Sequence, residues 1–151
     1  MSKSFEDLAV GDTIENGPVT VTAEMIQEFA ERYDPQPMHV DREAAADSMW
    51  GGLIASGWHT VSLCHMLLVE ITKEWGLGVG KGVEELTWKR PLRAGDELRV
   101  EYEIVAKQPV EDDREYGEFT YELCGYNQDD EVLVGWTGHG LLERRDSAES
   151  A

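Results

Sequence analysis

Asp34 and His39 lie at the two ends of the segment DPQPMH, residues 34–39. Pro35 and Pro37 fix their own φ angles and push the residue before each of them toward extended backbone. The segment therefore predicts a rigid, kinked loop instead of an ordinary helix. Such a loop can hold a carboxylate and an imidazole at one place, as proton transfer near neutral pH requires. We interpret Asp34 and His39 as an acid–base pair.

Helical patterns surround this loop and must position it. Residues 22–32 predict a helix capped by Thr22, and residues 41–48 predict a short helix capped by Asp41. The Gly-rich stretch GGLIASG, residues 51–57, opens a long helix that begins at residue 53 or 57 and continues to Trp75. This helix is apolar on nearly every side, which is typical of a helix that other elements wrap.

Strands follow the long helix. Four runs rich in Val, Ile, Tyr, Trp and Thr cover residues 82–88, 97–107, 116–127 and 131–143, and a short strand is expected at residues 19–21. One buried helix inside a strongly curved antiparallel sheet fits this order, so we expect an α+β hot-dog fold. A two-layer α+β sandwich of another topology is the alternative. We expect a single domain over residues 1–145 and a disordered tail at 146–151.

The chain is strongly acidic, with 31 acidic and 13 basic residues and a net charge of −18. This charge argues against nucleic acid or an anionic membrane as a partner. We interpret it as adaptation to a salty cytosol, because at molar salt the Debye length is about 3 Å and self-repulsion is screened. A merely acidic protein is the alternative. With no signal segment and no membrane-spanning run recognised, we expect a cytoplasmic protein.

Three segments, in this order, resemble the MaoC-like family of hot-dog proteins, which contains the (R)-specific enoyl-CoA hydratases. They are YDPQPMHVD (33–41), GLIASGWHT (52–60) and WKRPLRAGD (88–96). The resemblance implies that Asp34 and His39 activate a water that adds across a 2-enoyl thioester, while the N–H of Gly57 holds the thioester oxygen. It implies coenzyme A thioesters as substrates and neither a metal nor a redox cofactor. A helix N-terminus suits this role, since its N–H groups stabilise developing negative charge.

The chain departs from the family pattern at three positions. Tyr33 stands where a glycine is usual, and Gln36 stands where an asparagine is usual. His65 stands where the better-known hydratases have a hydroxyl residue that braces the aspartate. Gln36 can still offer an amide to the site, so we count it among the substrate-binding residues.

Further substrate-binding candidates are Ser56, His59 and Arg90. Ser56 and His59 are expected on one helix face, where they either line a substrate channel or form hydrogen bonds beside the buried helix. Arg90, with its basic neighbours, either meets the phosphates of coenzyme A or belongs to an ordinary solvated turn. The pair His39 and Asp41 has no third ligand at a suitable spacing, so no metal site is expected.

Together these patterns predict reversible syn hydration of a trans-2-enoyl-CoA to the (R)-3-hydroxyacyl-CoA. A hot-dog acyl-CoA thioesterase and a non-catalytic acyl-CoA-binding subunit are the alternatives. A single hot-dog sheet leaves an open edge, so we expect a homo-oligomer that is at least a dimer. No nucleic-acid or membrane partner is expected.

Overall fold

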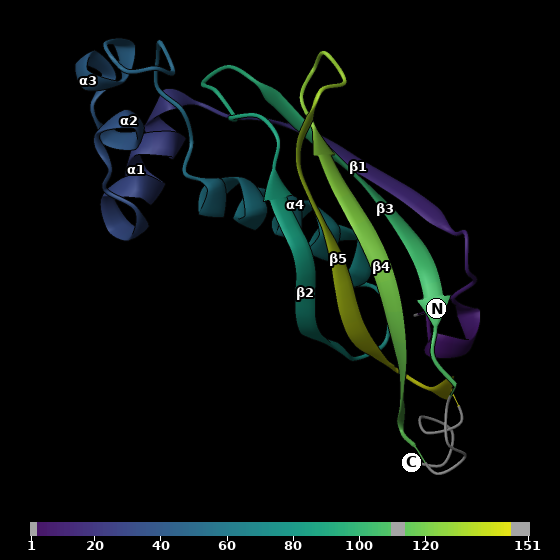
Figure 1. Cartoon of the computed structure of the whole chain (residues 1–151). Helices are drawn as coiled ribbons and strands as arrows, with labels where there is room; N and C mark the ends of the chain where they lie inside the picture. Colours follow the sequence, from purple (N-terminus) through teal and green to yellow (C-terminus); the bar gives the residue numbers. More distant parts are fainter. Residues whose placement is uncertain (1–2, 110–113, 146–151) are drawn as a thin grey trace.

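A curved, five-stranded antiparallel sheet and one long helix form the body of the protein (Figure 1). The computed structural model describes residues 3–109 and 114–145; the tail expected at 146–151 lies outside these ranges. The strands lie in the order β1-β3-β4-β5-β2, with bounds β1 (Thr13–Thr20), β2 (Gly78–Trp88), β3 (Glu97–Lys107), β4 (Tyr116–Tyr126) and β5 (Val132–Glu143). This is the hot-dog fold that the sequence predicted. β1 and β2 both extend further toward the N-terminus than expected.

The helices divide into two groups. The long helix α4 (Gly57–Thr72) lies along the inner side of the sheet (Figure 1). Three short helices gather beyond one end of the sheet, close to the start of α4; they are α1 (Ala23–Tyr33), α2 (Pro37–Val40) and α3 (Arg42–Ala46). A single 3₁₀ turn, η1 (Phe5–Asp7), precedes β1. None of the described helices is long and apolar enough to cross a membrane.

Side-chain caps set the starts of the helices. The Thr22 hydroxyl accepts the N–H of Met25 at α1, and the Asp41 carboxylate accepts two N–H groups at α3, as predicted. The prediction of a kinked loop instead of an ordinary helix holds for residues 34–36 only, because Pro37 begins the one-turn helix α2, which contains His39. Proline is suited to a first helical position, since its φ is already helical and its missing N–H is not needed there.

The core lies between one face of α4 and the inner face of the sheet. Buried side chains of α4 (Leu63, Cys64, Leu67 and Leu68) belong to one cluster with buried side chains of β3 (Leu98, Val100, Tyr102 and Ile104). Burial of one such aliphatic side chain stabilises the fold by about 1.5–3 kcal/mol. Burial also raises the pKa of the Cys64 thiol to about 12, so Cys64 behaves as a small apolar residue.

The opposite face of α4 is uncovered. The expectation that other elements wrap this helix is therefore wrong for that face. Trp58 is 57% exposed, and Met66 and Val69 are each 40% exposed. The neighbouring strand β2 is a sheet edge, and its Val79 and Val83 are also exposed. An apolar helix face therefore lies next to the free edge of β2, where apolar side chains are exposed.

On the outer face of the sheet, carboxylates stand directly opposite one another. Glu103 on β3 is paired with Glu122 on β4. Glu15 on β1 is paired with Glu101 on β3, whose charge is partly offset by Arg99 at 3.1 Å. Opposite residues of antiparallel strands share a face, and like charges there destabilise the pair. The strands thus place part of the net charge of −18 where it repels at short range.

We predict that the melting temperature rises from dilute buffer to molar potassium chloride, because salt screens these carboxylate pairs. Glu103→Gln should raise the melting temperature in dilute buffer, by relieving about 0.2–1 kcal/mol, and should weaken the salt dependence. The control is Glu28→Gln on α1, which removes the same charge one helical turn before Arg32, where the charge is favourable. A melting temperature that does not change with salt would contradict the prediction.

Candidate active site

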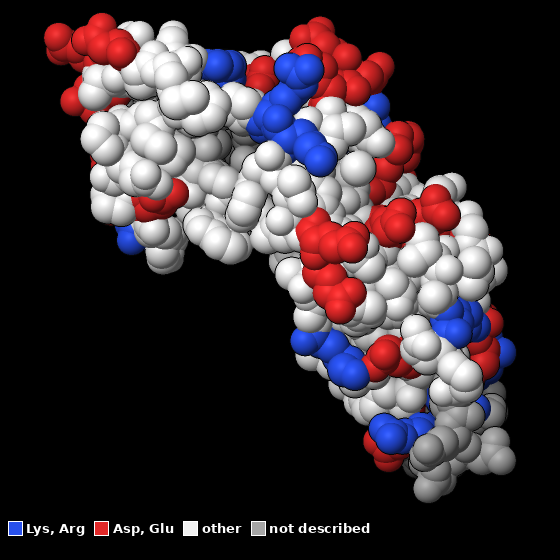
Figure 2. Space-filling model, viewed as in Figure 1, with Lys and Arg blue, Asp and Glu red and all other residues white. Residues whose placement is uncertain are grey.

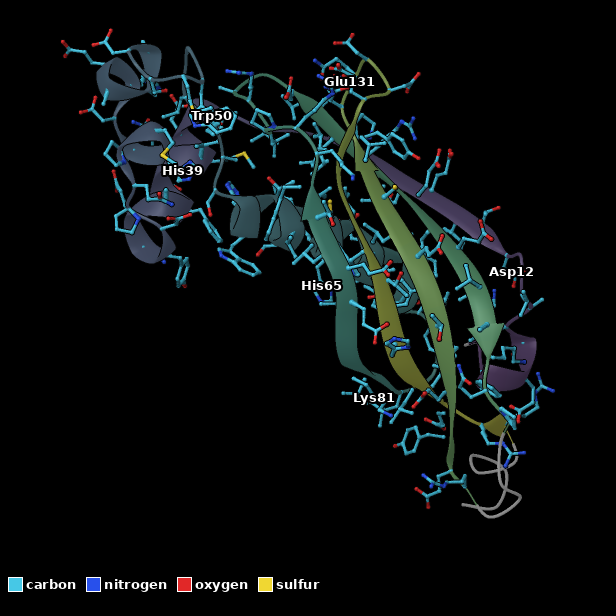
Figure 3. The ribbon with its side chains drawn as sticks, in the orientation of Figure 1. Asp12, His39, Trp50, His65, Lys81 and Glu131 are labelled. Atoms are coloured by element: carbon cyan, nitrogen blue, oxygen red, sulfur yellow. The ribbon has the colours of Figure 1, made fainter. Side chains whose placement is uncertain are left out.

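Three segments of the chain converge at one pocket of about 360 Å³. Asp34 follows the last residue of α1, His39 lies in the helical turn α2, and Gly57 is the first residue of α4. All three line the pocket, together with Gln36, Trp88 and Arg90. The structure thus brings together the three residues that the sequence analysis assigned to chemistry. Figure 3 shows His39 and Trp50 at this helical end of the molecule.

The Asp34 carboxylate is held by two hydrogen bonds. The Ser56 hydroxyl donates to Oδ2 at 2.7 Å, and the Gln36 amide donates to Oδ1 at 2.8 Å. These contacts, chiefly the one from Ser56, hold the pKa of Asp34 below its usual range although partial burial opposes this. At neutral pH Asp34 is therefore an oriented carboxylate and a hydrogen-bond acceptor.

The tautomer of His39 follows from its neighbours. His39 Nδ1 lies 2.7 Å from the carbonyl oxygen of Ile54, and a carbonyl only accepts, so Nδ1 carries the proton. In the neutral ring, Nε2 is then an acceptor, and it lies 3.5 Å from Asp34 Oδ2. This separation is too long for a good direct hydrogen bond. A water that donates one hydrogen to Nε2 and the other to Oδ2 satisfies both acceptors.

Gly57 provides a hydrogen-bond donor beside this pair. As the first residue of the 16-residue helix α4, it has an N–H without an intrahelical acceptor, and no other acceptor for it lies among the described residues. Its side-chain position is closed, because a β-carbon there would lie 2.7 Å from the indole of Trp88. The glycine therefore makes room for Trp88.

Residues 6–126 match the family model described as "MaoC like domain". The chain belongs to the MaoC-like domain family. It is 40% identical to a MaoC-like dehydratase from Rhodospirillum rubrum, with a TM-score of 0.83 over 94% of this chain and 97% of that one. It is 32% identical over 126 residues to the uncharacterised protein YdeM of Bacillus subtilis, covering 82% of this chain and 87% of YdeM.

A more distant likeness concerns the fold alone. The unliganded (R)-hydratase PhaJ1 from Pseudomonas aeruginosa is 22% identical, with a TM-score of 0.77 over 95% of this chain and 88% of that one. The MaoC-like fold of our chain is thus also the fold of a hydratase.

Ser56 supplies the hydroxyl that the family resemblance had placed at residue 65. Ser56 is fully buried, holds Asp34 and accepts the N–H of Trp58, but it does not line the pocket. Its buried position and its bond to Asp34 fit the alternative in which Ser56 forms hydrogen bonds beside the buried helix. His65 lies two turns further along α4, beside β2, and lines a different cavity (Figure 3).

His59 also lies outside the pocket lining. It is 6% exposed, and its ring stacks flat on Phe29 with 4.5 Å between centroids. Its Nδ1 has no hydrogen-bond partner among the described residues, and burial lowers its pKa, so the neutral ring is favoured. These contacts fit the structural alternative for His59, as a ring that packs α4 against α1.

The basic residues Lys89 and Arg90 line the same pocket as Asp34. Arg90 also pairs with Glu131 at 3.2 Å. Figure 2 shows basic side chains gathered above the notch between the helical end and the sheet, on a surface that otherwise carries many acidic groups. Among the described residues, no group of three or more His, Cys, Asp or Glu side chains is arranged to hold a metal ion.

We predict that Ser56→Ala raises the pKa of Asp34 toward its usual value, because it removes the main contact that favours the carboxylate. Because the pKa of Asp34 is lower in the folded wild type than in the unfolded chain, the ionised carboxylate stabilises the fold at pH values above about 3.9, the pKa of unfolded aspartate. This stabilisation, about 1.5 kcal/mol for a hydrogen bond to a charged group, is lost as the pH falls through the folded pKa. Carboxyl ¹³C titration measures the pKa directly.

Urea unfolding between pH 7 and pH 3 provides the second measurement. The gap in unfolding free energy between wild type and Ser56→Ala should shrink as the pH falls. Thr22→Ala is the matched control, because it removes a hydroxyl cap of α1 that touches no carboxylate at the site, and its gap should stay constant. Equal Asp34 pKa values in wild type and Ser56→Ala would show that the hydroxyl does not tune the carboxylate.

Proposed function

We propose that this MaoC-like protein catalyses the reversible hydration of a trans-2-enoyl-CoA to the (R)-3-hydroxyacyl-CoA. The main support is the pair of acceptors Asp34 Oδ2 and His39 Nε2, 3.5 Å apart, next to the N–H of Gly57 in one pocket. These parts suit the addition of water to an alkene that is conjugated to a thioester. Family membership and the fold shared with (R)-hydratases agree with this proposal.

In the proposed reaction, the water oxygen bonds to the β-carbon while the alkene electrons move toward the thioester oxygen. The Gly57 N–H and the N-terminus of α4 stabilise the negative charge that develops there. Asp34 orients the water and His39 Nε2 takes its proton. His39 then gives this proton to the α-carbon as the thioester carbonyl re-forms. Both new bonds form on the face where the water is held, so addition is syn.

Coenzyme A fits the charge distribution around the pocket. The protein carries −18 overall, so a polyanionic ligand needs local cations to approach it. Lys89 and Arg90 line the pocket and can meet phosphate groups. We therefore propose that the thioester end of the substrate reaches Asp34 while its phosphates stay near these two residues.

We propose that a second copy of the chain covers the exposed side of α4 and the free edge of β2. The support is the apolar surface formed by Trp58, Met66, Val69, Val79 and Val83, since an exposed apolar strand edge otherwise invites aggregation. Pairing two β2 edges about a two-fold axis sets their α4 helices antiparallel, so the second half of one helix faces the first half of the other.

That arrangement also provides a binding site for the acyl chain of the substrate. A cavity of about 640 Å³ lies between the second half of α4 and the sheet, with an apolar and aromatic lining that includes Leu68, Trp75, Tyr121 and Leu142. In the proposed dimer this cavity faces the site of the other copy. We propose that it receives the acyl group, which would place one substrate across two subunits.

We predict that Asp34→Asn and His39→Gln each nearly abolish hydration of crotonyl-CoA. The double variant should be little worse than either single variant, because groups that act on one water lose their effect together. Loss of enoyl absorbance measures hydration. Multiplicative losses, or near-normal activity in either variant, would contradict a shared water.

Two controls separate the alternatives in the same samples. A thiol assay reports hydrolysis, so thiol release without loss of the alkene would favour the thioesterase. Binding of saturated butyryl-CoA without any turnover would favour a non-catalytic binding subunit. Light scattering should show dimers for the wild type and both variants, and an active monomer would contradict the acyl site between subunits.

A further inference from the structure

We infer that Trp88 is a positioning residue that fixes the first turn of α4 and so aims the N–H of Gly57 at the thioester oxygen. This inference rests on the proposed hydration, in which that N–H is the oxyanion donor. Trp88 lies at the end of β2, 31 residues from Gly57 in sequence. Nothing in the sequence around Trp88 indicates this role.

Two contacts join the indole to Gly57. Trp88 Nε1–H donates to the Gly57 carbonyl oxygen at 2.9 Å, and the ring fills the side-chain position of Gly57, 2.7 Å from where a β-carbon would lie. The ring of Trp58 meets the Trp88 ring edge-on, with centroids 5.2 Å apart. The indole thus contacts Gly57 at two places, at the carbonyl oxygen through the N–H and at the side-chain position of its Cα through the ring.

A bulge in β2 brings Trp88 to this position. The register between β2 and β5 shifts between Glu84 and Thr87, and Glu85 adopts a left-handed φ of 55°. Beyond the bulge, Trp88 stands opposite Val134, which is fully buried on the inner face of the sheet. Because successive strand residues alternate between faces, the extra residue places Trp88, and not Thr87, on the side facing α4.

The first turn of α4 needs such support. The Gly57 N–H lacks an intrahelical acceptor, and a glycine at the first position has more backbone freedom than any other residue. On the N-terminal side of Gly57, the Ser56 carbonyl accepts the N–H groups of His59 and Thr60 at 3.0 and 3.1 Å, and on the other side Trp88 Nε1–H donates to the Gly57 carbonyl. With both flanking peptide groups held, the direction of the Gly57 N–H is set before substrate binds, which favours charge stabilisation in the transition state.

The test is Trp88→Phe, which keeps a ring over Gly57 but removes the N–H donor. We expect kcat for crotonyl-CoA hydration to fall about fivefold, which corresponds to the loss of one hydrogen bond of about 1 kcal/mol when about 1.4 kcal/mol is tenfold. KM should change less than twofold. Trp88→Leu, which also loses the ring, should lower kcat further.

Trp136→Phe is the matched control. Its indole N–H donates to the Tyr121 hydroxyl at 3.2 Å in the core, and Trp136 is not among the residues that line either cavity. Both Phe variants lose one indole hydrogen bond, so their melting temperatures should fall by similar amounts. Only Trp88→Phe should lower kcat.

Amide hydrogen exchange across residues 58–61 provides a readout that does not need turnover. Exchange should be faster in Trp88→Phe than in Trp136→Phe. If the wild type lacks hydratase activity, the proposed function fails. The exchange comparison then decides by itself whether Trp88 holds the first turn of α4. Equal exchange in the two variants would overturn that role of Trp88. In an active enzyme, unchanged kcat in Trp88→Phe, with or without a raised KM, would overturn the positioning role.

Discussion

The hydrogen bond from Ser56 to Asp34 is the contact on which the site depends. It joins the end of α1 to the start of α4, two points 22 residues apart in sequence. Through it the carboxylate is kept ionised and oriented, and it lies near the N-terminus of a 16-residue helix, whose dipole favours negative charge. The same hydroxyl caps α4 by accepting the N–H of Trp58. One side chain thus connects the stability of the helix start with the electrostatics of the pocket.

The two halves of the site come from different parts of the fold. The acid–base pair lies on the short helices beyond the sheet, whereas the proposed oxyanion donor lies at the start of the helix that the sheet packs against (Figure 1). Ile54 links them, because its carbonyl sets the His39 tautomer and its own N–H donates to the Met38 carbonyl. Trp88 adds a connection to the sheet edge. Rigidity of the helix start therefore affects both halves.

Much of this arrangement could be predicted from the sequence, where local rules apply. Strand β3 has the predicted bounds, residues 97–107, because its alternation of polar and apolar residues is regular. Thr22 and Asp41 cap the predicted helices, since capping depends only on neighbouring residues. The proximity of Asp34 and His39 also followed from a short segment with two prolines.

The features that sequence reasoning missed depend on contacts between distant segments. From the sequence, Ser56 was expected to line a channel or to form hydrogen bonds beside the helix, and only the fold shows that its hydroxyl reaches Asp34. The bulge that turns Trp88 inward depends on the register between β2 and β5, which the residues VEELTW do not specify. The uncovered face of α4 was mistaken for a buried one, because apolar residues that lack partners within one chain have the same composition as a core.

The most direct measurement of the central claim is the protonation of His39 in the free protein at neutral pH. The shared-water mechanism requires a proton on Nδ1, hydrogen-bonded to the Ile54 carbonyl, and an unprotonated Nε2 that can share a water with Asp34. Long-range ¹H–¹⁵N NMR of the imidazole rings distinguishes the tautomers, and His39→Gln identifies the signal. We predict the Nδ1–H tautomer. A neutral ring with its proton on Nε2, or a fully protonated ring, would put a donor against Asp34 and contradict the shared-water mechanism.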